Sequence, residues 1–255
     1  MKKIIITGGP TNEPIDEVMK ITNMSTGRLS VNLGELFLKA GYAVCLILNN
    51  SVNTGSLSGM DNLELVWIET TDEMLAALET QSAAGRGADA VIHASAVGDY
   101  KSGFSFLLED MAEELFAKRG SFKSAGDILR VMENPGCKLD DSSKISSYQR
   151  NLTVKLALTP KIISRLREWY PDSLLIGCKL LENVSKDELF DAAEELCKKN
   201  RMDYILANDL SELRRGMQER YVVTKDGYKG STLALPEDIF KFVDEKLKSS
   251  FGSVS

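Results

Sequence analysis

The stretch from Ile4 to Gly27 constrains the fold most strongly, because it joins a short apolar run to an amphipathic helix. Lys2 to Ile6 is typical of a buried strand, since it is short, β-branched and followed by Gly8 and Gly9. A strand that ends at glycines usually brings the chain to the carboxyl edge of a parallel sheet, where open α/β folds bind their ligands. We therefore expect a ligand site close to this end of the chain.

A polar connection of roughly 20 residues separates this strand from the next helix, which is longer than the usual βα loop. The helix begins near Gly27, ends at Gly41 and carries its apolar residues on one face. Ser25 or Thr26 is expected to cap it, and the free N–H groups of its first turn suit a phosphate. A plain helix cap without a ligand remains the alternative.

Strands alternate with helices through most of the chain. Strands are expected at 42–48, 63–68, 88–93, 152–158, 173–177 and 203–207, with a hairpin over 218–224 and 228–235 around Asp226 and Gly227. Helices are expected at 71–84, from Thr159-Pro160 onward, from a Ser185 cap to Asn200, and at 236–247, with a frayed tail from Ser249. The pattern predicts an α/β fold with a Rossmann-like, doubly wound and mostly parallel sheet.

Residues 101–143 interrupt the alternation of strands and helices. They contain two helix-like stretches, 107–118 and 125–133, and a turn at 134–136. We interpret 101–143 as an insertion, either a lid or an oligomer contact, within a single Rossmann-like domain that covers 1–255. The hairpin after residue 217 is then an appended element.

Composition narrows the class of protein. The 255 residues carry a net charge of −6, which argues against a protein whose main task is to bind nucleic acid or an anionic membrane. No apolar run approaches the ~18 residues of a membrane span, and no signal peptide is evident, so a cytoplasmic location is expected. Four widely spaced cysteines and a single histidine make a zinc site, a disulfide framework or a histidine-dependent triad improbable.

The small residues Ala94, Ser95 and Ala96 follow another expected strand and allow a ligand to approach the backbone. Asp99 can accept hydrogen bonds from a base or ribose, although a turn cap is equally compatible with it. His93 lies inside the strand and is expected to be a core histidine. Lys144 can neutralise a phosphate, but it also suits a solvated surface.

Two common nucleotide sites are excluded by the motifs. The first loop lacks the third glycine of GxGxxG, and the second strand ends in Leu48-Asn49-Asn50 without the acidic residue that holds an adenine ribose. A P-loop is also absent from the sequence. The residues alone therefore indicate an enzyme of Rossmann-like fold that binds a nucleotide or another phosphate ligand.

Seven motifs occur in a fixed order along nearly the whole chain: TGGPTNEPID, ITNMSTG, HASAVGDY, KISS, LTPKII, GCKLL and DYILANDL. Together they resemble the phosphopantothenate–cysteine ligase family in its monofunctional bacterial form. The resemblance implies a homodimer that uses CTP and Mg²⁺ to convert the carboxylate of 4′-phosphopantothenate into an acyl-cytidylate. L-Cysteine then gives 4′-phosphopantothenoylcysteine and CMP, a step of coenzyme A biosynthesis. A separate flavin-dependent decarboxylase would be a pathway neighbour.

The resemblance also assigns roles to residues. Asn23 matches the asparagine that acts on the acyl-cytidylate, and Lys144 matches the lysine that contacts the triphosphate. Ser25, Thr26 and Gly27 match the substrate-binding, phosphate-holding turn, and Mg²⁺ is expected on the nucleotide phosphates rather than on a protein cluster. The remaining nucleotide-binding positions implied by the resemblance are Gly8, Gly9, Ala94, Ser95, Ala96, Asp99, Pro160, Lys161, Ile162, Ile163, Cys178, Lys198 and Lys199.

The chain departs from the usual family pattern at several positions: Met19 for an arginine, Met24 for a histidine, Leu158 for a lysine and Cys178 for a phenylalanine. Lys198 and Lys199 are shifted relative to the family's paired lysines. These changes remove charge and stacking, so they leave the choice between CTP and ATP open. They also leave a second hypothesis, a catalytically weak nucleotide-binding regulatory or partner subunit.

Overall fold

The computed structural model describes residues 1–83 and 87–249, which form two compact units. The sheet unit comprises Met1–Thr11, Met24–Val97 and Pro160–Ser255, and the hairpin unit comprises Asn12–Asn23 and Gly98–Thr159. The predicted end of the second helix at Ala84 and most of the predicted frayed tail lie outside the described residues.

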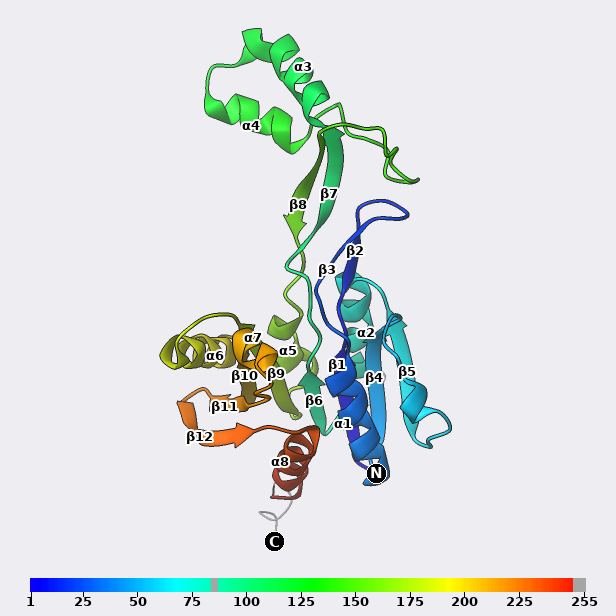
Figure 1. Cartoon of the computed structure of the whole chain (residues 1–255), viewed down its shortest axis with the longest axis vertical. Coiled ribbons are helices and arrows are strands. Elements are labelled where there is room, and N and C mark those ends of the chain that lie inside the picture. The colour runs from blue at the N-terminus through cyan, green and yellow to red at the C-terminus, as the bar shows by residue number, and fades with distance from the viewer. Residues whose placement is uncertain (84–86, 250–255) are drawn as a thin grey trace. The chain divides into compact units, whose positions relative to one another are not determined.

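The sheet unit is built on one sheet that contains eight strands among the described residues, in the order β12-β11-β10-β9-β6-β1-β4-β5 (Figure 1). All neighbouring pairs from β10 to β5 are parallel, and β11 and β12 form the antiparallel edge. The strands are β1 Lys3–Gly8, β4 Ala43–Asn49, β5 Leu63–Ile68, β6 Ala90–His93, β9 Leu174–Leu181, β10 Tyr204–Asp209, β11 Arg220–Thr224 and β12 Gly227–Leu233.

Helices cover both faces of this sheet. One apolar cluster joins the sheet to α1 (Arg28–Lys39) and α8 (Pro236–Ser249). A second cluster on the other face joins it to α2 (Thr71–Ala83), α5 (Leu166–Trp169) and α6 (Lys186–Asn200). The short elements η1 (Gly55–Leu57), η3 (Ile162–Ser164) and α7 (Leu210–Arg214) complete the unit. The expected doubly wound α/β fold with an appended hairpin is therefore confirmed.

The strand order reverses between β1 and β6. From β1 the chain moves through β4 to β5 on one side, and it then returns to β6 and continues to β9 and β10 on the other side. The carboxyl ends of β1 and β6 thus border a topological switch point, where open α/β sheets bind their ligands. This position places the predicted glycine turn and the predicted 94–96 segment next to each other.

Local sequence explains the helix that follows β9. The predicted cap by Ser185 is confirmed: the N–H of Glu188 donates to the Ser185 hydroxyl. The N–H of Ser185 also donates to the Glu188 carboxylate, which completes a capping box. Lys198 and Lys199 lie in the last turn, where positive charge is favourable. No helix among the described residues is long and apolar enough to cross a membrane.

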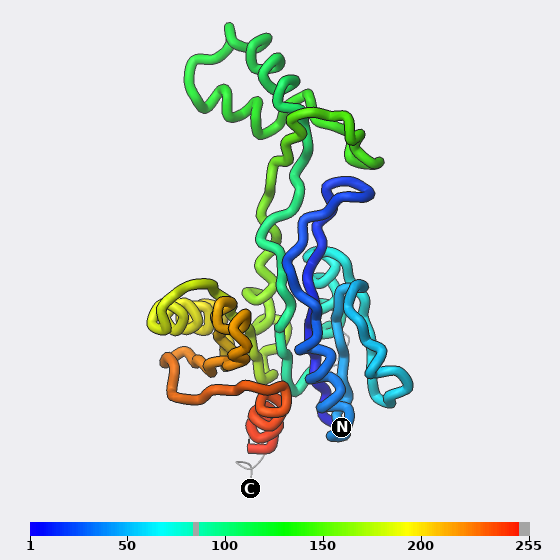
Figure 2. The backbone as a smooth tube through the Cα atoms, viewed as in Figure 1, coloured from blue at the N-terminus to red at the C-terminus, as the bar shows by residue number. Residues whose placement is uncertain are grey.

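The hairpin unit contains two antiparallel ribbons, which Figure 2 shows as tubes. One pairs β2 (Asn12–Pro14) with β3 (Lys20–Thr22), and the other pairs β7 (Tyr100–Leu107) with β8 (Leu152–Leu158). The helices α3 (Leu108–Lys118) and α4 (Ala125–Glu133) and the turn η2 (Arg119–Ser121) connect β7 to β8. A small core of Phe104, Phe106 and Met111 stabilises this connection.

Two expectations about the chain's organisation need correction. The connection after Gly9 is not an irregular loop, since it contains β2 and β3. The expected insertion over 101–143 is too narrow, because residues 98–159 form the second unit together with 12–23. The physical reason is that β8 pairs with β7 and not with the central sheet. That the chain folds as a single domain remains a prediction.

The helix expected from Thr159-Pro160 onward is formed only in part. The chain forms only η3 and the four-residue α5. Thr159 does not cap a helix, since its hydroxyl donates to the carbonyl of Gly98 and its N–H donates to the carbonyl of Asp99. Tertiary hydrogen bonds therefore use the groups that a helix cap would need.

Candidate functional site

The glycine turn at the end of β1 packs directly against the start of α1. A Cβ atom on Gly8 would lie 2.3 Å from the Ser30 hydroxyl oxygen, and Gly9 has a φ of +80°. Side chains at either position would therefore displace the helix or strain the backbone. The Ser30 hydroxyl donates to the carbonyl of Thr7 at 2.8 Å and fixes the helix against the strand.

The segment after β6 lies beside this turn. The Ala96 N–H donates to the Gly9 carbonyl at 2.9 Å, and the Thr11 N–H donates to the Ala96 carbonyl at 3.3 Å. Pro10 and Ala96 form an isolated parallel bridge. The structure thus brings together Gly8, Gly9, Ala94, Ser95 and Ala96 at the switch point, as the sequence predicts.

His93 is a core histidine, which confirms the expectation for this residue. It is 7% exposed, and its Nδ1 atom lies 2.8 Å from the Thr7 hydroxyl. Burial lowers the pKa of the imidazole to about 4, so the ring is neutral near pH 7. The Ser95 N–H also donates to the Thr7 hydroxyl, while the buried Ser95 hydroxyl has no partner among the described residues. A buried hydroxyl without a partner leaves hydrogen-bonding capacity unused at this edge of the sheet.

The start of α1 differs from the prediction. Gly27 is the N-cap, with a φ of +67°, and no side chain caps the helix. The Ser25 and Thr26 hydroxyls accept only long contacts of 3.4 Å, from the N–H groups of Gly27 and Arg28. The predicted cap by Ser25 or Thr26 is therefore wrong, because a left-handed glycine reverses the chain there. The phosphate-binding role of this turn stays a prediction.

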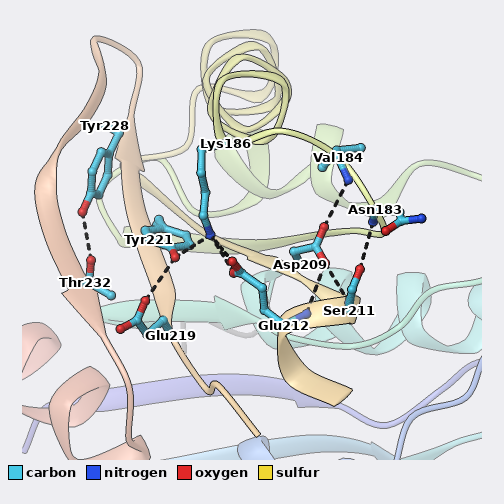
Figure 3. A network of polar contacts seen from close by, with 10 residues as sticks. All are labelled: Asn183, Val184, Lys186, Asp209, Ser211, Glu212, Glu219, Tyr221, Tyr228 and Thr232. Atoms are coloured by element: carbon cyan, nitrogen blue, oxygen red, sulfur yellow. Dashed lines mark hydrogen bonds and ion pairs between the residues drawn. The ribbon is translucent and has the colours of Figure 1, made fainter. Parts of the chain in front are cut away.

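Asp209, at the end of β10, fixes the loops at the carboxyl ends of β9 and β10. Its carboxylate accepts hydrogen bonds from the N–H groups of Ser211 (2.7 Å) and Glu212 (3.3 Å), which caps α7, and from Val184 (3.3 Å) (Figure 3). A hydrogen bond with the Ser211 side chain, followed by these backbone bonds, lowers the pKa of the Asp209 carboxyl to about 2. The final aspartate of the DYILANDL motif thus ties the loop after β9 to α7.

Lys186 extends this network along the same edge. Its Nζ atom lies 2.6 Å from both carboxylate oxygens of Glu212 and donates to the Tyr221 hydroxyl at 2.5 Å. The Tyr221 hydroxyl in turn donates to Glu219 at 3.1 Å. Lys186, Glu212 and Tyr221 come from α6, α7 and β11, and Glu219 directly precedes β11 (Figure 3). Lys186 is not among the predicted site residues, because its only signal in the sequence is its position one residue after a helix cap.

Arg220 begins β11, beside the carboxyl end of β10, and its guanidinium is largely enclosed. It donates to the carbonyl oxygens of Gln218 (3.0 Å) and Ala234 (3.2 Å), and no carboxylate among the described residues pairs with it. Burial lowers the pKa of Arg220, although the guanidinium stays charged near neutral pH. A guanidinium that donates only to carbonyl oxygens keeps its positive charge available to pair with an anionic group. The sequence analysis missed it because an isolated arginine in a hairpin is usually solvated.

Cys178 lies on β9, in the strand next to β10, and is partly buried. Burial raises the pKa of its thiol to about 11, and the positive charge of Arg220 opposes that rise slightly. The thiol is therefore neutral and a poor nucleophile near pH 7. Its predicted nucleotide contact stays a prediction.

The segment after Thr159 carries four predicted nucleotide-binding residues. Ile162 is buried against the sheet. The side chain of Ile163 lies close to Gly177, because a Cβ atom placed on that glycine would be 3.1 Å from the Ile163 Cδ1 atom. Pro160 is half-buried and Lys161 is exposed. Ile162 and Ile163 therefore pack against the sheet, and Lys161 is the exposed member of this segment.

Lys198 and Lys199 are not brought to this edge. They end α6, which runs antiparallel to the parallel strands, so they lie near the amino end of β10. A cavity of about 710 Å³ opens there, lined by Lys198, Arg201, Asp203, Tyr204 and neighbouring residues. It lies at the opposite edge of the sheet from Ala94–Ala96 and is not the candidate site. The nucleotide role of both lysines stays a prediction without support from these positions.

In the hairpin unit, Asn23 follows β3 directly and is exposed. The strand before it is fixed by the Thr22 hydroxyl, which donates to the Asn12 side-chain oxygen at 2.6 Å. Asp99 is exposed, precedes β7 and accepts a backbone hydrogen bond from Thr159. The strands β2 and β3 pack against β7, so the hairpin with Asn23 lies next to the strand that Asp99 precedes.

Lys144 belongs to the same unit, with an exposed side chain near the turn of the β2–β3 hairpin. The Ile145 N–H donates to the Asp16 carboxylate at 2.9 Å, which ties the two segments together. Four residues of chain separate Asp16 from Asn12, about 13 Å at the rise of an extended strand. The hairpin therefore carries Asn23 at its base and holds Lys144 near its turn.

Known proteins resemble the chain along most of its length. The family model for the DNA/pantothenate metabolism flavoprotein C-terminal domain matches residues 1–106. The coenzyme A biosynthesis bifunctional protein CoaBC of Thermococcus kodakarensis is 29% identical over 222 residues, 87% of this chain and 44% of that protein. The CoaBC protein of Methanocaldococcus jannaschii is 28% identical over 255 residues, 97% of this chain and 51% of that protein. The chain thus spans about half the length of these relatives.

Solved structures show the same relationship. The DNA/pantothenate metabolism flavoprotein from Streptococcus pneumoniae is 31% identical, with a TM-score of 0.78, over 98% of this chain and 100% of that one. The C-terminal domain of CoaBC aligns with a TM-score of 0.63 over 98% of this chain and 96% of that one. At 19% identity, this second likeness shows the fold alone.

Proposed function

The chain belongs to the family of the DNA/pantothenate metabolism flavoprotein C-terminal domain, and from this premise we propose that it is a phosphopantothenate–cysteine ligase. The proposed reaction joins 4′-phosphopantothenate to the amino group of L-cysteine at the cost of CTP. The observation that carries the proposal is the alignment with the CoaBC proteins of coenzyme A biosynthesis, which extends over up to 97% of this chain.

The proposed reaction has two steps. A carboxylate oxygen of 4′-phosphopantothenate attacks the α-phosphorus of CTP, which forms the acyl-cytidylate and releases pyrophosphate. The amino group of cysteine then attacks the acyl carbon, which forms the amide, releases CMP and loses a proton. A carboxylate is a poor electrophile, so its conversion to an ester with a good leaving group is the central task of the enzyme.

In the sheet unit, we assign the nucleotide to the switch point between β1 and β6. Gly8 and Gly9 allow close approach of a ligand to the backbone, and Ala94 to Ala96 border the same edge. Gly27 turns the chain into α1, whose N-terminal N–H groups suit a phosphate. Arg220 supplies positive charge at the carboxyl end of β10. Pairing of this charge with a phosphate would satisfy a cation that no described carboxylate neutralises.

In the hairpin unit, we assign charge neutralisation to Lys144 and stabilisation of the acyl group to Asn23. Lys144 would lower the repulsion when the carboxylate meets the triphosphate. The Asn23 amide would donate to the carbonyl oxygen as it gains negative charge during attack by cysteine. Asp99 would accept hydrogen bonds from the nucleotide. Orientation of the two substrates supplies a large further part of the rate.

Magnesium is expected as the ion that accompanies the triphosphate. No group of three or more histidine, cysteine, aspartate or glutamate side chains converges within 1–83 and 87–249. An ion carried mainly by phosphate oxygens would need no dedicated protein cage. When bound, the ion would neutralise charge on the phosphates.

The test is turnover by the purified chain with CTP, Mg²⁺, 4′-phosphopantothenate and cysteine. We expect equal amounts of pyrophosphate, CMP and amide product, and the same assay with ATP in place of CTP measures the nucleotide preference. Lys144→Gln should slow pyrophosphate release, whereas the exposed loop variant Asp141→Asn should not. No turnover with either nucleotide would overturn the proposal. Thermal stabilisation by CTP without turnover would instead indicate a regulatory or partner subunit.

A further inference from the structure

The loop that carries Lys144 is fixed to the rest of its unit mainly at one point. Between residues 140 and 151, the side chain of Ile145 is the only one that is buried. The other hydrogen bonds described for 140–150 are local, such as Ser142 N–H to Asp140 and Gln149 N–H to the Ser146 carbonyl. The position of Lys144 therefore depends on the residue that follows it.

The anchor for Ile145 is the carboxylate of Asp16, which is 5% exposed. Its Oδ2 atom accepts the Ile145 N–H at 2.9 Å. Its Oδ1 atom accepts the N–H groups of Val18 at 2.7 Å and Met19 at 2.6 Å, and these two bonds shape the turn between β2 and β3. One carboxylate thus joins the hairpin that leads to Asn23 with the loop that carries Lys144.

We propose that Asp16 is a positioning residue, which acts on the ligation reaction by holding the peptide group between Lys144 and Ile145 and so fixing Lys144 for its proposed role in the first step. This inference rests on the proposed function. Asp16 itself touches neither substrate nor nucleotide in this assignment. Its effect is transmitted through one hydrogen bond to the backbone next to the lysine.

The charge state of Asp16 supports a permanent anchor. Hydrogen bonds from Met19, Ile145 and Val18, in this order, together with the charge of Lys144, lower the pKa of the Asp16 carboxyl. The group is therefore ionised throughout the pH range of an enzyme assay. A charged acceptor also forms a stronger hydrogen bond than a neutral one.

Asp16→Asn separates the two functions of the carboxylate. An amide has one acceptor oxygen, so the side chain can keep its bonds to Val18 and Met19 only by turning its NH₂ group toward the Ile145 N–H. Two donors then face each other, and the anchor is lost while the hairpin turn is kept. Asp141→Asn is the matched control, because it also removes one negative charge from the hairpin unit, in the loop that carries Lys144, at an exposed carboxylate with no described partner.

Backbone hydrogen exchange tests the anchor without any enzyme assay. In Asp16→Asn, the Ile145 amide should exchange at least about tenfold faster, as expected for loss of a hydrogen bond to a charged group. The amides of Val18 and Met19 should change little. Unchanged exchange at Ile145, or equal acceleration at all three amides, would overturn the inference.

A double-mutant cycle tests the link to Lys144. Asp16→Asn should lower kcat/KM for CTP about tenfold and leave KM for cysteine unchanged, since only the first step uses the lysine. In a Lys144→Gln background, the same change should alter kcat/KM less than about twofold. A general loss of structure would instead lower all parameters in both backgrounds, which would overturn the positioning role.

The two proposals fail in different ways. If the wild-type chain shows no turnover, the proposed ligase function fails. The double-mutant cycle of Asp16 and Lys144 can then still be measured, with the CTP affinity from calorimetry in place of kcat/KM. If turnover is normal but Asp16→Asn matches Asp141→Asn in exchange and kinetics, the inference about Asp16 fails while the ligase function stands.

Discussion

The Nδ1 atom of His93 lies 2.8 Å from the hydroxyl oxygen of Thr7, in the interior of the parallel sheet between β1 and β6. This contact joins the two strands that border the switch point. The imidazole accepts or donates this bond as a neutral group, because burial lowers its pKa to about 4. The only histidine of the chain is thus a structural residue directly beneath the candidate site.

This burial predicts a loss of stability in mild acid. The unfolded chain protonates His93 near pH 6.5 and the folded chain only near pH 4, so the unfolded state binds more protons between these values. Protonation of His93 in the unfolded state should therefore lower the free energy of unfolding by about 3 kcal/mol as the pH decreases from 6.5 to 4. Urea unfolding across this range should show a smaller decrease for His93→Gln. An equal decrease in both proteins would contradict the prediction.

Gly8→Ala should disturb the glycine turn. Its Cβ would lie 2.3 Å from the Ser30 hydroxyl and 2.9 Å from a Leu48 methyl group, so α1 or β4 has to move. Overpacking of this kind costs about 1–3 kcal/mol of unfolding free energy, and CTP affinity should fall with it. Gly120→Ala is the control, because a Cβ there meets no atom within 4 Å. Similar stability and affinity in the two variants would refute a tight turn at Gly8.

Asn23→Asp should separate the two proposed steps. A carboxylate beside the acyl group repels the negative charge that develops when cysteine attacks, and it cannot donate a hydrogen bond. Pyrophosphate should still be released, while formation of CMP and amide slows by ~100-fold. Rapid-quench analysis should show accumulated acyl-cytidylate. Asn53→Asp, on an exposed loop of the sheet unit, should retain full activity. Equal activity in both variants would remove Asn23 from the mechanism.

Lys186→Met should weaken the network along the carboxyl edge of β9 and β10. Glu212 would lose its ion pair at 2.6 Å, and Tyr221 would lose a charged donor. Because the lysine is partly solvated, we expect a loss of about 1 kcal/mol, or about 2–4 °C in Tm. Arg214→Met breaks a more exposed pair with Glu182 and should cost less than about 0.5 kcal/mol. Calorimetric melting curves of both variants decide between these values.

Short-range patterns predicted much of the sheet unit. The β-branched runs of β1 and β4, the helix cap at Ser185 and the hairpin around Gly227 depend on neighbours in sequence, and each was found close to its expected position. The glycine turn and Ala94–Ala96 also met as expected, because parallel strands place their carboxyl ends at one edge. These features follow from local geometry and from burial of apolar side chains.

Other elements depend on contacts between distant residues. Each strand of the β2–β3 hairpin has only three residues, and Asp16 and the packing against β7 hold the hairpin in place. β7 contains Gly103 and two serines and forms a strand because β8 pairs with it. Thr159 looks like a helix cap, but its hydroxyl bonds to Gly98. Intrinsic helix and strand propensities contribute less free energy than these tertiary contacts, so the contacts decide the local structure.

The sequence by itself determined the doubly wound sheet, the switch-point glycines and the family to which the chain belongs. Hydrophobic periodicity and ordered motifs depend only on the order of residues along the chain. Only the tertiary structure decided that Lys198 and Lys199 lie at the far edge of the sheet, that Arg220 is a cation without a described carboxylate, and that Asp16 holds the loop of Lys144. These depend on hydrogen bonds and packing between residues up to 129 positions apart, which no local pattern encodes.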